Sequence, residues 1–506
     1  MMKFIDDQLN GITMYRLILY YLILLFGAAF YFSILGSVSL DPFALLFSLG
    51  LLIAVCWITN RVFSLTYGVP TNVESVYISA LILALIITPP QSASDIWFLT
   101  WAGILSMASK YMIAFRGKHL FNPAAFAVVL TYFMANQSAS WWIGSAVMLP
   151  VTLVGGLLVV RKIGRFDLVL GFLASNLAFT ILETLYTGDG LLMTLQNTFL
   201  YSPILFFACV ILTEPLTTPP TRRKRIYYGS LLGFLFTPQL HFGSLYITPE
   251  LAIILGNIYS FIVSPKEKLV LKLKDKSLIA PDIYEFIFSV PRRFKFNPGQ
   301  YMEWTLGHQY PDARGNRRYF TLASSPSEKV LKLGIKFNEN SSTFKKNMLN
   351  LNKGSEIIAS QLDGDFILPN DRMQKYIFIA GGIGITPFRS MIKHLLDIRQ
   401  HRSITLLYAV KDEKDIVYKD ILDRAERELG IKTIYSISNN GNHLSALPHT
   451  ATRFDETFIR KTFPHLRTYI FYISGSRGMV EGFKSTLYRA GVSRSQIKED
   501  FFAGLN

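Results

Sequence analysis

The fold of the C-terminal half is decided by residues 376–398, which read YIFIAGGIGITPFRSMIKHLLDI. The apolar run 376–380 predicts a buried strand of a parallel sheet. The run 388–398 predicts a helix, with Pro387 suited to its first position. The turn between them is rich in glycine, which lets the backbone approach a pyrophosphate. The stretch therefore predicts an α/β domain that binds a nucleotide.

Two further strands support this α/β domain. Residues 403–410 and 468–473 are both strand-like, and the second runs into Ser474-Gly475-Ser476. Ligands bind at the carboxyl ends of the strands in such a sheet. Ser474 is therefore a candidate site residue. The chain closes on residues 497–505, which include Asp500 and Phe502.

A different pattern precedes this domain. Short β-rich runs separated by turn residues are typical of an antiparallel barrel, and they lie at 269–273, 283–290, 301–306, 318–323 and 330–337. Three stretches of this region carry groups suited to binding: Asn297–Tyr301, Arg317–Pro326 and Ser341–Lys345.

The second and third of these stretches carry the chemistry. Arg318 has the planar fork that clamps a pyrophosphate. The face of Phe320 can stack on a flat ring, and the Thr321 hydroxyl can hydrogen-bond a ring nitrogen. Ser342 and Thr343 open an amphipathic helix, where free N–H groups attract an anion. Taken alone, that helix start is explained more simply by capping.

In this order the three stretches resemble the ferredoxin–NADP reductase superfamily, whose flavin barrel carries an R-x-[YF]-[ST] strand after a P-G-Q-[YF] turn. The resemblance implies FAD, with Arg318 on the pyrophosphate, Phe320 on the flavin and Thr321 near its N5. It also places Asp363–Phe366 near the end of the barrel. The FAD-binding residues that it implies are Arg318, Tyr319, Phe320, Thr321, Ser324, Ser342 and Thr343.

The same resemblance implies a nicotinamide domain that transfers hydride from NAD(P)H to the flavin. Asp500 and Phe502 match the family's terminal segment, which returns to cover the flavin. The family often has Cys-Gly-Pro where this chain has Ser474-Gly475-Ser476, so a thiol is replaced by a small hydroxyl. The choice between NADH and NADPH stays open. The implied nicotinamide-binding residues are Gly381, Gly382, Gly384 and Thr386, and the implied catalytic residues are Thr321, Ser474 and Asp500.

The N-terminal half differs sharply in composition. Residues 1–265 carry 13 Lys+Arg and 10 Asp+Glu, whereas residues 266–506 carry 38 and 25. The first half contains apolar runs of the kind that cross membranes, near 17–34, 43–60, 75–88, 93–109, 122–135, 141–160, 167–186, 198–213, 227–240 and 248–264. This composition excludes a purely soluble enzyme and a disordered chain.

The predicted architecture is therefore multi-domain. An all-α polytopic membrane bundle of about ten spans occupies residues 1–265. An antiparallel β-barrel FAD domain follows over 266–371, and an α/β NAD(P)-binding domain over 372–506.

The basic residues of the first half indicate its orientation. With ten spans, all 13 fall on one side of the membrane, and short basic loops stay in the cytoplasm. This predicts a multi-pass protein of the inner (plasma) membrane with both termini and the reductase domains cytoplasmic. The net charge of +16 is explained by attraction to anionic membrane lipid or by a solvated positive face. Nucleic-acid binding explains it poorly.

A reductase fused to a membrane bundle predicts electron flow into the membrane. Two stacked haems would need four axial histidines, and residues 1–265 contain only His119 and His241. The segments 118–125 and 212–221 put polar and proline residues at membrane depth, which is costly unless they line a cavity. Both segments resemble the family that contains the D subunit of the Rnf electron-transport complex and the B subunit of the sodium-translocating NADH:quinone reductase. Helix caps and breaks explain the same residues without a site.

That second family carries FMN on a Thr in an S-x-A-T motif. The nearest match here is Thr194, which lacks the Ser and the Ala. FMN, riboflavin or a quinone in the membrane domain therefore stays open. Cys56 and Cys209 lie in apolar runs, and two cysteines cannot supply the four ligands of an iron–sulfur cluster. No metal is expected in the hydride step.

These patterns together predict a membrane-bound flavoprotein oxidoreductase. Electrons pass from NAD(P)H through FAD to an acceptor in or at the membrane domain, which is a flavin, a quinone or a partner subunit of an electron-transport chain. The alternative is a redox-driven ion or small-molecule transporter subunit, with Glu183 and Glu214 as the intramembrane acids. A non-catalytic structural subunit conflicts with the flavin and nicotinamide motifs.

Overall fold

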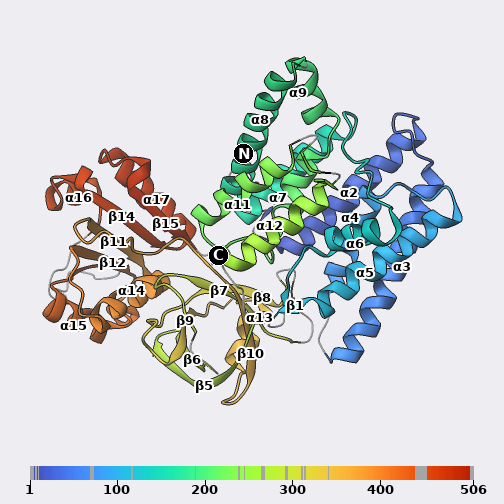
Figure 1. The fold of residues 1–506 in the computed structure, drawn as a ribbon. Helices are drawn as coiled ribbons and strands as arrows, with labels where there is room; N and C mark the ends of the chain where they lie inside the picture. Colours follow the sequence, from blue (N-terminus) through green and yellow to red (C-terminus); the bar gives the residue numbers. More distant parts are fainter. Residues whose placement is uncertain are drawn as a thin grey trace. The chain divides into compact units, whose positions relative to one another are not determined.

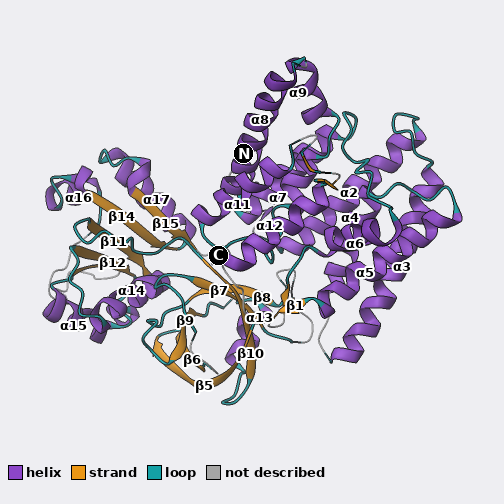
Figure 2. Cartoon of the chain, viewed as in Figure 1, coloured by secondary structure: helices purple, strands orange, loops and turns teal. Residues whose placement is uncertain are grey.

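The computed structural model describes residues 5, 8, 9, 11–68, 73–115, 118–188, 190–237, 240–243, 245–263, 268–290, 294–308, 312, 315–339, 341–438 and 453–501. The chain forms two compact units, Met1–Glu267 and Lys268–Asn506. The first is helical and the second contains two larger sheets (Figures 1 and 2).

The described helices of the first unit surround one apolar core. They are α2 (Met14–Ile34), α3 (Pro42–Tyr67), α4 (Val73–Ile86), α5 (Ala93–Met112), α6 (Pro123–Ala135), α7 (Leu149–Ile163), α8 (Phe166–Thr187), α9 (Leu191–Leu200), α10 (Ile204–Phe206), the π-helix η1 (Phe207–Ile211), α11 (Arg222–Leu235) and α12 (Pro249–Val263). Two small hairpins join them, β1 (Ala114–Phe115) with β2 (Lys118–His119) and β3 (His241–Phe242) with β4 (Leu245–Tyr246).

Helices α8 and α11 pack especially closely. A Cβ added to Gly229 would lie 2.4 Å from the Leu168 carbonyl oxygen, and one added to Gly233 would lie 2.3 Å from that of Phe172. The N-terminal ends of the two helices are joined by an ion pair of 2.8 Å between Arg225 of α11 and Asp167 of α8. The two helices therefore run parallel, with their N-terminal ends at the same end of the unit.

The prediction of about ten spans is wrong for the described residues. Three helices, α2, α3 and α8, are long and apolar enough to cross a membrane, or four if the bent pair Leu191–Leu200 and Ile204–Ile211 counts as one. The apolar helices α4, α6 and α12 have only 14, 13 and 15 residues, whereas a span needs about 20. Each of these helices corresponds to an apolar run that is itself shorter than a span, namely 75–88, 122–135 and 248–264.

The parallel sheet of the second unit has the strand order β13-β12-β11-β14-β15. Helices α14 and α15 pack on one face, and α16 and α17 on the other. The elements are β11 (Lys375–Gly381), η2 (Gly382–Ile385), α14 (Thr386–Asp397), β12 (Ile404–Val410), η3 (Glu413–Asp415), α15 (Lys419–Leu429), β13 (Lys432–Ile437), α16 (Glu456–Thr462), η4 (Leu466–Thr468), β14 (Tyr469–Gly475), α17 (Arg477–Arg489), η5 (Arg494–Gln496) and β15 (Ile497–Phe501). The predicted strand–turn–helix over 376–398 is confirmed.

The antiparallel sheet precedes it, with six strands in the order β8-β7-β10-β5-β6-β9 around an apolar core. They are β5 (Leu269–Ala280), β6 (Ile283–Ser289), β7 (Tyr301–Thr305), β8 (Arg317–Thr321), β9 (Val330–Lys336) and β10 (Glu356–Asp363), with α13 (Thr343–Leu349) between the last two. The five predicted strand runs are confirmed. Strand β10 was not predicted, and it pairs with both β5 and β7. The predicted domain boundary at 371/372 stays a prediction.

Candidate functional site

Strand β8 brings two of the predicted FAD residues together with the start of α13. The Arg318 guanidinium lies 5.4 Å from the centre of the Phe344 ring, and the Phe320 ring centre lies 6.1 Å from that of Phe344. Residues 318 and 320 share one face of the strand because side chains alternate along it. Phe344, which the sequence patterns did not single out, anchors this face in the apolar core.

A carboxylate lies where the predicted phosphate contacts converge. Asp312 Oδ1 is 3.5 Å from Arg318 Nη2, and Asp312 Oδ2 accepts a hydrogen bond of 3.1 Å from the Thr343 backbone N–H. The Thr343 hydroxyl accepts from the Asp312 backbone N–H at 3.0 Å. Arg318 and Thr343 therefore form a cradle that holds an anion, and the residues present fit a pyrophosphate.

Three other predicted FAD residues have local partners. The Ser342 hydroxyl caps α13 by accepting from the Lys345 N–H at 3.4 Å. The Ser324 hydroxyl accepts from the Lys332 N–H at 3.2 Å. The exposed Tyr319 donates its hydroxyl hydrogen to Glu303 Oε2 at 3.0 Å. Their predicted contacts with FAD stay predictions.

The three predicted catalytic residues meet at the carboxyl edge of the parallel sheet. Ser474 at the end of β14 lies beside Asp500 of β15 in the strand register. Thr321 at the end of β8 lies close enough to Asp500 for its hydroxyl to affect that carboxyl. Thr321 Oγ1, Ser474 Oγ and Asp500 Oδ2 are all buried, and none of them makes a hydrogen bond of normal geometry within the described part of the chain. Three unsatisfied polar atoms in one place are unusual in a folded protein and fit a site for a polar ligand.

The charge state of this site is unusual. Burial raises the pKa of the Asp500 carboxyl to about 7, and the neighbouring Thr321 hydroxyl opposes part of that rise. The carboxyl is therefore partly protonated near neutral pH, so it can donate or accept a hydrogen bond. A perturbed acid in such a place is typical of a functional site. Phe502, the predicted flavin cover, lies outside the described residues.

The glycine-rich turn lies directly beside this group. Ser474 is paired with Ala380, the residue before the turn. A Cβ added to Gly384 would lie 2.3 Å from the Ser474 carbonyl oxygen, so only glycine allows the turn to approach β14 so closely. Gly382 has a φ of +51°, and the Thr386 hydroxyl donates to the Ile383 carbonyl at 3.1 Å.

A methionine that the sequence patterns did not single out covers two of these glycines. The Met479 sulfur would lie 2.0 Å from a Cβ on Gly381 and 2.3 Å from one on Gly475. Small residues at 381 and 475 therefore leave room for a side chain or a ligand over the turn. Met479 comes five residues after Ser474 on α17, and nothing in its sequence context marks it as part of a site.

Comparisons with known proteins find similar sequences for the C-terminal half of the chain. Residues 378–485 match the model of the oxidoreductase NAD-binding domain. The chain is 31% identical over 156 residues to the stachydrine N-demethylase reductase subunit Stc4 of Rhizobium meliloti (strain 1021), covering 30% of this chain and 43% of that protein. It is 24% identical to the terephthalate 1,2-dioxygenase reductase component 1 of Comamonas sp, covering 47% of this chain and 69% of that protein.

The C-terminal region is therefore similar to NAD-binding oxidoreductases and to the reductase components of other proteins. Reductases of this kind bind FAD and NAD(P)H. Among solved structures, the cytochrome P450 reductase GcoB of Amycolatopsis is 21% identical with a TM-score of 0.42, covering 47% of this chain and 70% of that one. The chain spans about half the length of several of these relatives, including 52% of the flavohemoprotein of Bacillus subtilis (strain 168), to which it is 22% identical over 41% of this chain.

The first unit holds a second polar cluster. Glu214, just after the π-helix, contacts His119 Nε2 at 3.1 Å and accepts from Asn122 Nδ2 at 2.9 Å. Asn257 accepts from the Asn122 backbone N–H at 2.8 Å and donates to the Tyr228 hydroxyl at 3.0 Å. The segments singled out as 118–125 and 212–221 therefore meet. Their resemblance to the Rnf and quinone-reductase subunits stays a prediction.

Thr194 is not part of the polar cluster around Glu214. It lies in the first turn of α9, and its hydroxyl donates to the Gly190 carbonyl at 3.3 Å. This bond is an ordinary one between a helical threonine and the preceding turn.

Proposed function

We propose that this protein is a membrane-bound flavoprotein oxidoreductase that takes electrons from NAD(P)H and passes them to an acceptor at its N-terminal unit. The observation that carries the proposal is the meeting of Thr321, Ser474 and Asp500 beside the glycine-rich turn, with three buried polar atoms left unsatisfied among the described residues. The acceptor is a flavin, a quinone or a partner protein.

Each part of the site has a distinct task in this proposal. Arg318 and the Thr343 N–H hold the pyrophosphate of FAD in place of the Asp312 carboxylate. Thr321 and Ser474 orient the reacting rings through hydrogen bonds, and Asp500 holds or releases a proton at its carboxyl. When bound, FAD would supply the chemistry that links hydride transfer from NAD(P)H to the release of electrons singly or in pairs.

The membrane location is supported by the surface of the first unit. Helices α2, α3 and α8 are long and apolar. Large apolar side chains on them are exposed, among them Leu24, Phe43, Trp57 and Leu182. So much exposed apolar surface is rare on a soluble protein and is expected where lipid covers a helix. We therefore propose that these helices lie in the inner (plasma) membrane.

The orientation rests on charge. Arg161, Lys162 and Arg165 precede α8, and Arg222–Arg225 begin α11. The ion pair between Arg225 and Asp167 shows that both groups lie at the same end of the first unit. Basic residues at helix ends favour the cytoplasmic side. We propose that this end faces the cytoplasm, where anionic lipid attracts it, and that the reductase region lies on that side.

The direct test is rapid mixing of the purified, FAD-loaded protein with NADH and, separately, with NADPH. We expect the flavin absorbance to bleach with at least one of them, and the faster donor identifies the natural one. If neither bleaches the flavin, the dehydrogenase function is wrong. Extracting the cofactors from the same preparation shows whether FMN or riboflavin accompanies FAD.

A redox-driven transporter is the second candidate, and the Glu214 cluster favours it. Ionisable groups inside a membrane bundle commonly mark an ion path, and Glu214 contacts both His119 and Asn122 in the first unit. Vesicles containing the protein distinguish the two functions. Ion movement that accompanies NADH oxidation supports a transporter, and oxidation without ion movement supports a plain reductase.

A further inference from the structure

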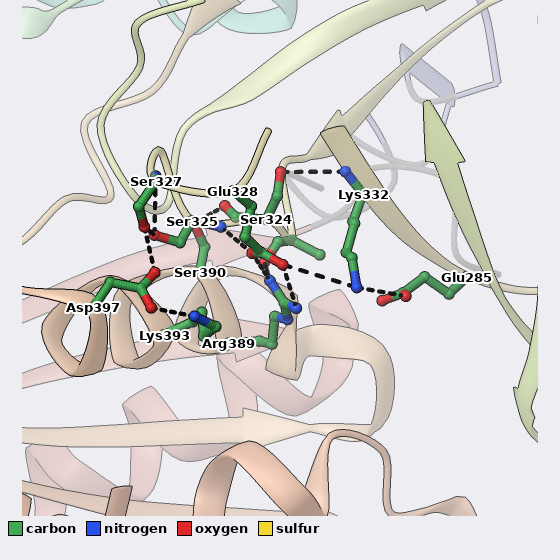
Figure 3. Close-up of polar contacts among 11 residues, drawn as sticks. Glu285, Ser324, Ser325, Ser327, Glu328, Lys332, Arg389, Ser390, Lys393 and Asp397 are labelled. Atoms are coloured by element: carbon green, nitrogen blue, oxygen red, sulfur yellow. Dashed lines mark hydrogen bonds and ion pairs between the residues drawn. The ribbon is translucent and has the colours of Figure 1, made fainter. Parts of the chain in front are cut away.

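A cluster of polar side chains, four of them charged, lies between the antiparallel sheet and helix α14 and is largely shielded from solvent. We call it the Arg389 cluster, and it consists of Glu285, Glu328, Lys332, Arg389 and Tyr418. Figure 3 shows four of these residues, with the Arg389 guanidinium pointing from α14 toward the β8–β9 connection. Arg389 is only 2% exposed. Burying charges costs free energy unless each charge has a partner.

Arg389 joins the two halves of the second unit through the segment that follows β8. Its Nη1 donates to the Ala323 carbonyl at 2.8 Å, and its Nη2 donates to Glu328 Oε1 at 3.1 Å. A second contact between Nη1 and Glu328 Oε2 completes a two-pronged ion pair. The neighbouring Ser390 hydroxyl donates to the Ser324 carbonyl at 2.6 Å.

The Glu328 carboxylate also has partners other than Arg389. Glu328 Oε2 accepts from the Ser325 N–H at 2.6 Å. Lys332 Nζ lies 3.8 Å from Glu328 Oε1 and 3.1 Å from Glu285 Oε2. The backbone turn of residues 323–328 is therefore fixed by charges from both β9 and α14.

A third contact of the Arg389 cluster concerns the spacing between strand β9 and helix α14. The Arg389 guanidinium lies 5.5 Å from the centre of the Tyr418 ring, and Tyr418 adopts a φ of +61°, which is uncommon for a tyrosine. Gly334 of β9 faces it: an added Cβ would lie 2.7 Å from the Tyr418 hydroxyl oxygen and 2.9 Å from Thr386 Cγ2. The antiparallel sheet thus touches the helix that follows the glycine-rich turn.

These contacts lie very near the two parts of the candidate site. Ala323 is two residues after Thr321, and Arg389 is three residues after Thr386. We infer that the Arg389 cluster is a positioning device that sets the distance between the flavin strand β8 and the nicotinamide turn, and so controls the rate of hydride transfer. The inference rests on the proposed function, because it needs both cofactors in that site.

The Arg389 cluster contributes precise placement of the two surfaces rather than stability. Apolar side chains of similar volume would hold two surfaces together as well as a buried ion pair does. The two-pronged Arg–carboxylate pair adds a defined direction and distance. Hydride transfer falls steeply when the reacting atoms are misplaced by about 1 Å. A buried directional clamp is therefore suited to a step that depends on spacing.

The test measures flavin reduction in the full-length, FAD-loaded protein at rising NADH concentration. The variants are Glu328→Gln, which keeps the shape and removes the charge, and Gly334→Ala, which pushes the two surfaces apart without touching the ion pair. We expect both to lower the limiting reduction rate about tenfold, with FAD content and half-saturating NADH unchanged. The deuterium isotope effect with C4-deuterated NADH should rise, because transfer itself becomes slower.

The matched controls are Glu428→Gln and Arg424→Met. These residues form an Arg–Glu pair at 2.6 Å on α15, but their side chains are 46% and 49% exposed. They should leave the rate and the isotope effect unchanged. If the cluster is only a scaffold, its variants lose FAD or thermal stability while the limiting rate of the loaded protein stays the same.

The outcomes separate this inference from the proposed function. If neither nucleotide bleaches the flavin of the wild-type protein, the proposed function fails and this inference fails with it. If the wild-type protein is bleached but Glu328→Gln and Gly334→Ala keep its limiting rate and isotope effect, only the positioning role is wrong.

Discussion

At the scale of single residues, the site depends on polar groups that the fold leaves without partners. Thr321, Ser474 and Asp500 come from three strands, and each has a buried oxygen with no hydrogen bond of normal geometry in the described part of the chain. Such atoms cost free energy unless a ligand satisfies them. Asp312 differs from them, because it forms an ion pair with Arg318 and accepts a hydrogen bond from the Thr343 N–H.

The first residue-scale prediction concerns Asp500. Because burial raises the pKa of its carboxyl from 3.8 to about 7, the folded state of the cofactor-depleted protein binds the proton more tightly than the unfolded state. The free energy of unfolding should therefore fall as the pH rises from about 4 to about 7, by up to about 1.4 kcal/mol per pH unit.

Asp500→Asn should remove this fall and be more stable than the wild type above pH 7. Thermal unfolding at a series of pH values measures the effect. Asp420→Asn, which changes an exposed carboxyl on α15, is the control and should follow the wild type. Parallel pH profiles for Asp500→Asn and the wild type would contradict the assignment.

The second residue-scale prediction concerns Arg318. Replacing it with alanine removes charge-assisted hydrogen bonds to the FAD pyrophosphate, which are worth about 1.5–3 kcal/mol. The FAD dissociation constant of Arg318→Ala should rise roughly ten- to hundredfold, measured by fluorescence titration of the cofactor-depleted protein.

Arg317→Ala is the matched control for this experiment. Arg317 contacts Glu303 at 3.3 Å, away from the α13 cradle, so its loss should change the FAD dissociation constant little. Full FAD affinity in Arg318→Ala would show that the pyrophosphate lies elsewhere.

At the scale of elements, close backbone approach decides where the site forms. The glycine-rich turn can lie against the end of β14 only because residue 384 has no side chain. The same principle acts in the first unit, where Gly229 and Gly233 let α11 lie against α8. In both places two elements far apart in the sequence meet at a distance that any Cβ would prevent.

Gly384→Ala is the element-scale prediction. The new Cβ would lie 2.3 Å from the Ser474 carbonyl oxygen and 2.7 Å from Gly475 Cα, so β14 must shift. FAD binding should survive, since the antiparallel sheet is untouched. The half-saturating NADH concentration in flavin reduction should rise roughly five- to a hundredfold, because strain and displacement of about 1–3 kcal/mol are expected.

Gly478→Ala on α17 is the matched control, because nothing lies within 4 Å of its added Cβ. It should reduce its flavin at the wild-type rate and NADH concentration. An unchanged NADH dependence in Gly384→Ala would mean that the turn is not where the dinucleotide binds.

At the scale of the whole molecule, the two compact units differ in composition and in architecture. The second unit carries the reductase region, and the first carries helices with the length and composition of membrane spans. The proposed function needs both, because electrons that leave the flavin reach an acceptor at the first unit.

The whole-molecule prediction is that the chain is integral to the membrane. Washing membranes with alkaline carbonate, which strips peripheral proteins, should leave it in the pellet. The reason is that its exposed apolar helices lose their lipid cover if it leaves. Recovery in the supernatant would contradict the proposed location without affecting the flavin chemistry.

How much was predictable from sequence depended on the range of the interactions. The strand, turn and helix over 376–398, the five β-rich runs and the residues at their ends were predicted, because periodicity, glycine and proline act over a few neighbouring residues. The span count was wrong, because short apolar runs such as 122–135 were counted as spans although the helices that they form are too short to cross a membrane. Strand β10 was missed because its pairing with β5 and β7 depends on residues far away in the chain.

The sequence by itself determined the local elements, the contrast between the two halves and the residue types of the candidate site. Only the tertiary structure brought Asp312 onto Arg318, Asp500 beside Thr321 and Arg389 onto Glu328. These pairs join residues 6 to 179 positions apart. Which charge meets which depends on how the sheets and helices pack, and no local pattern carries that information.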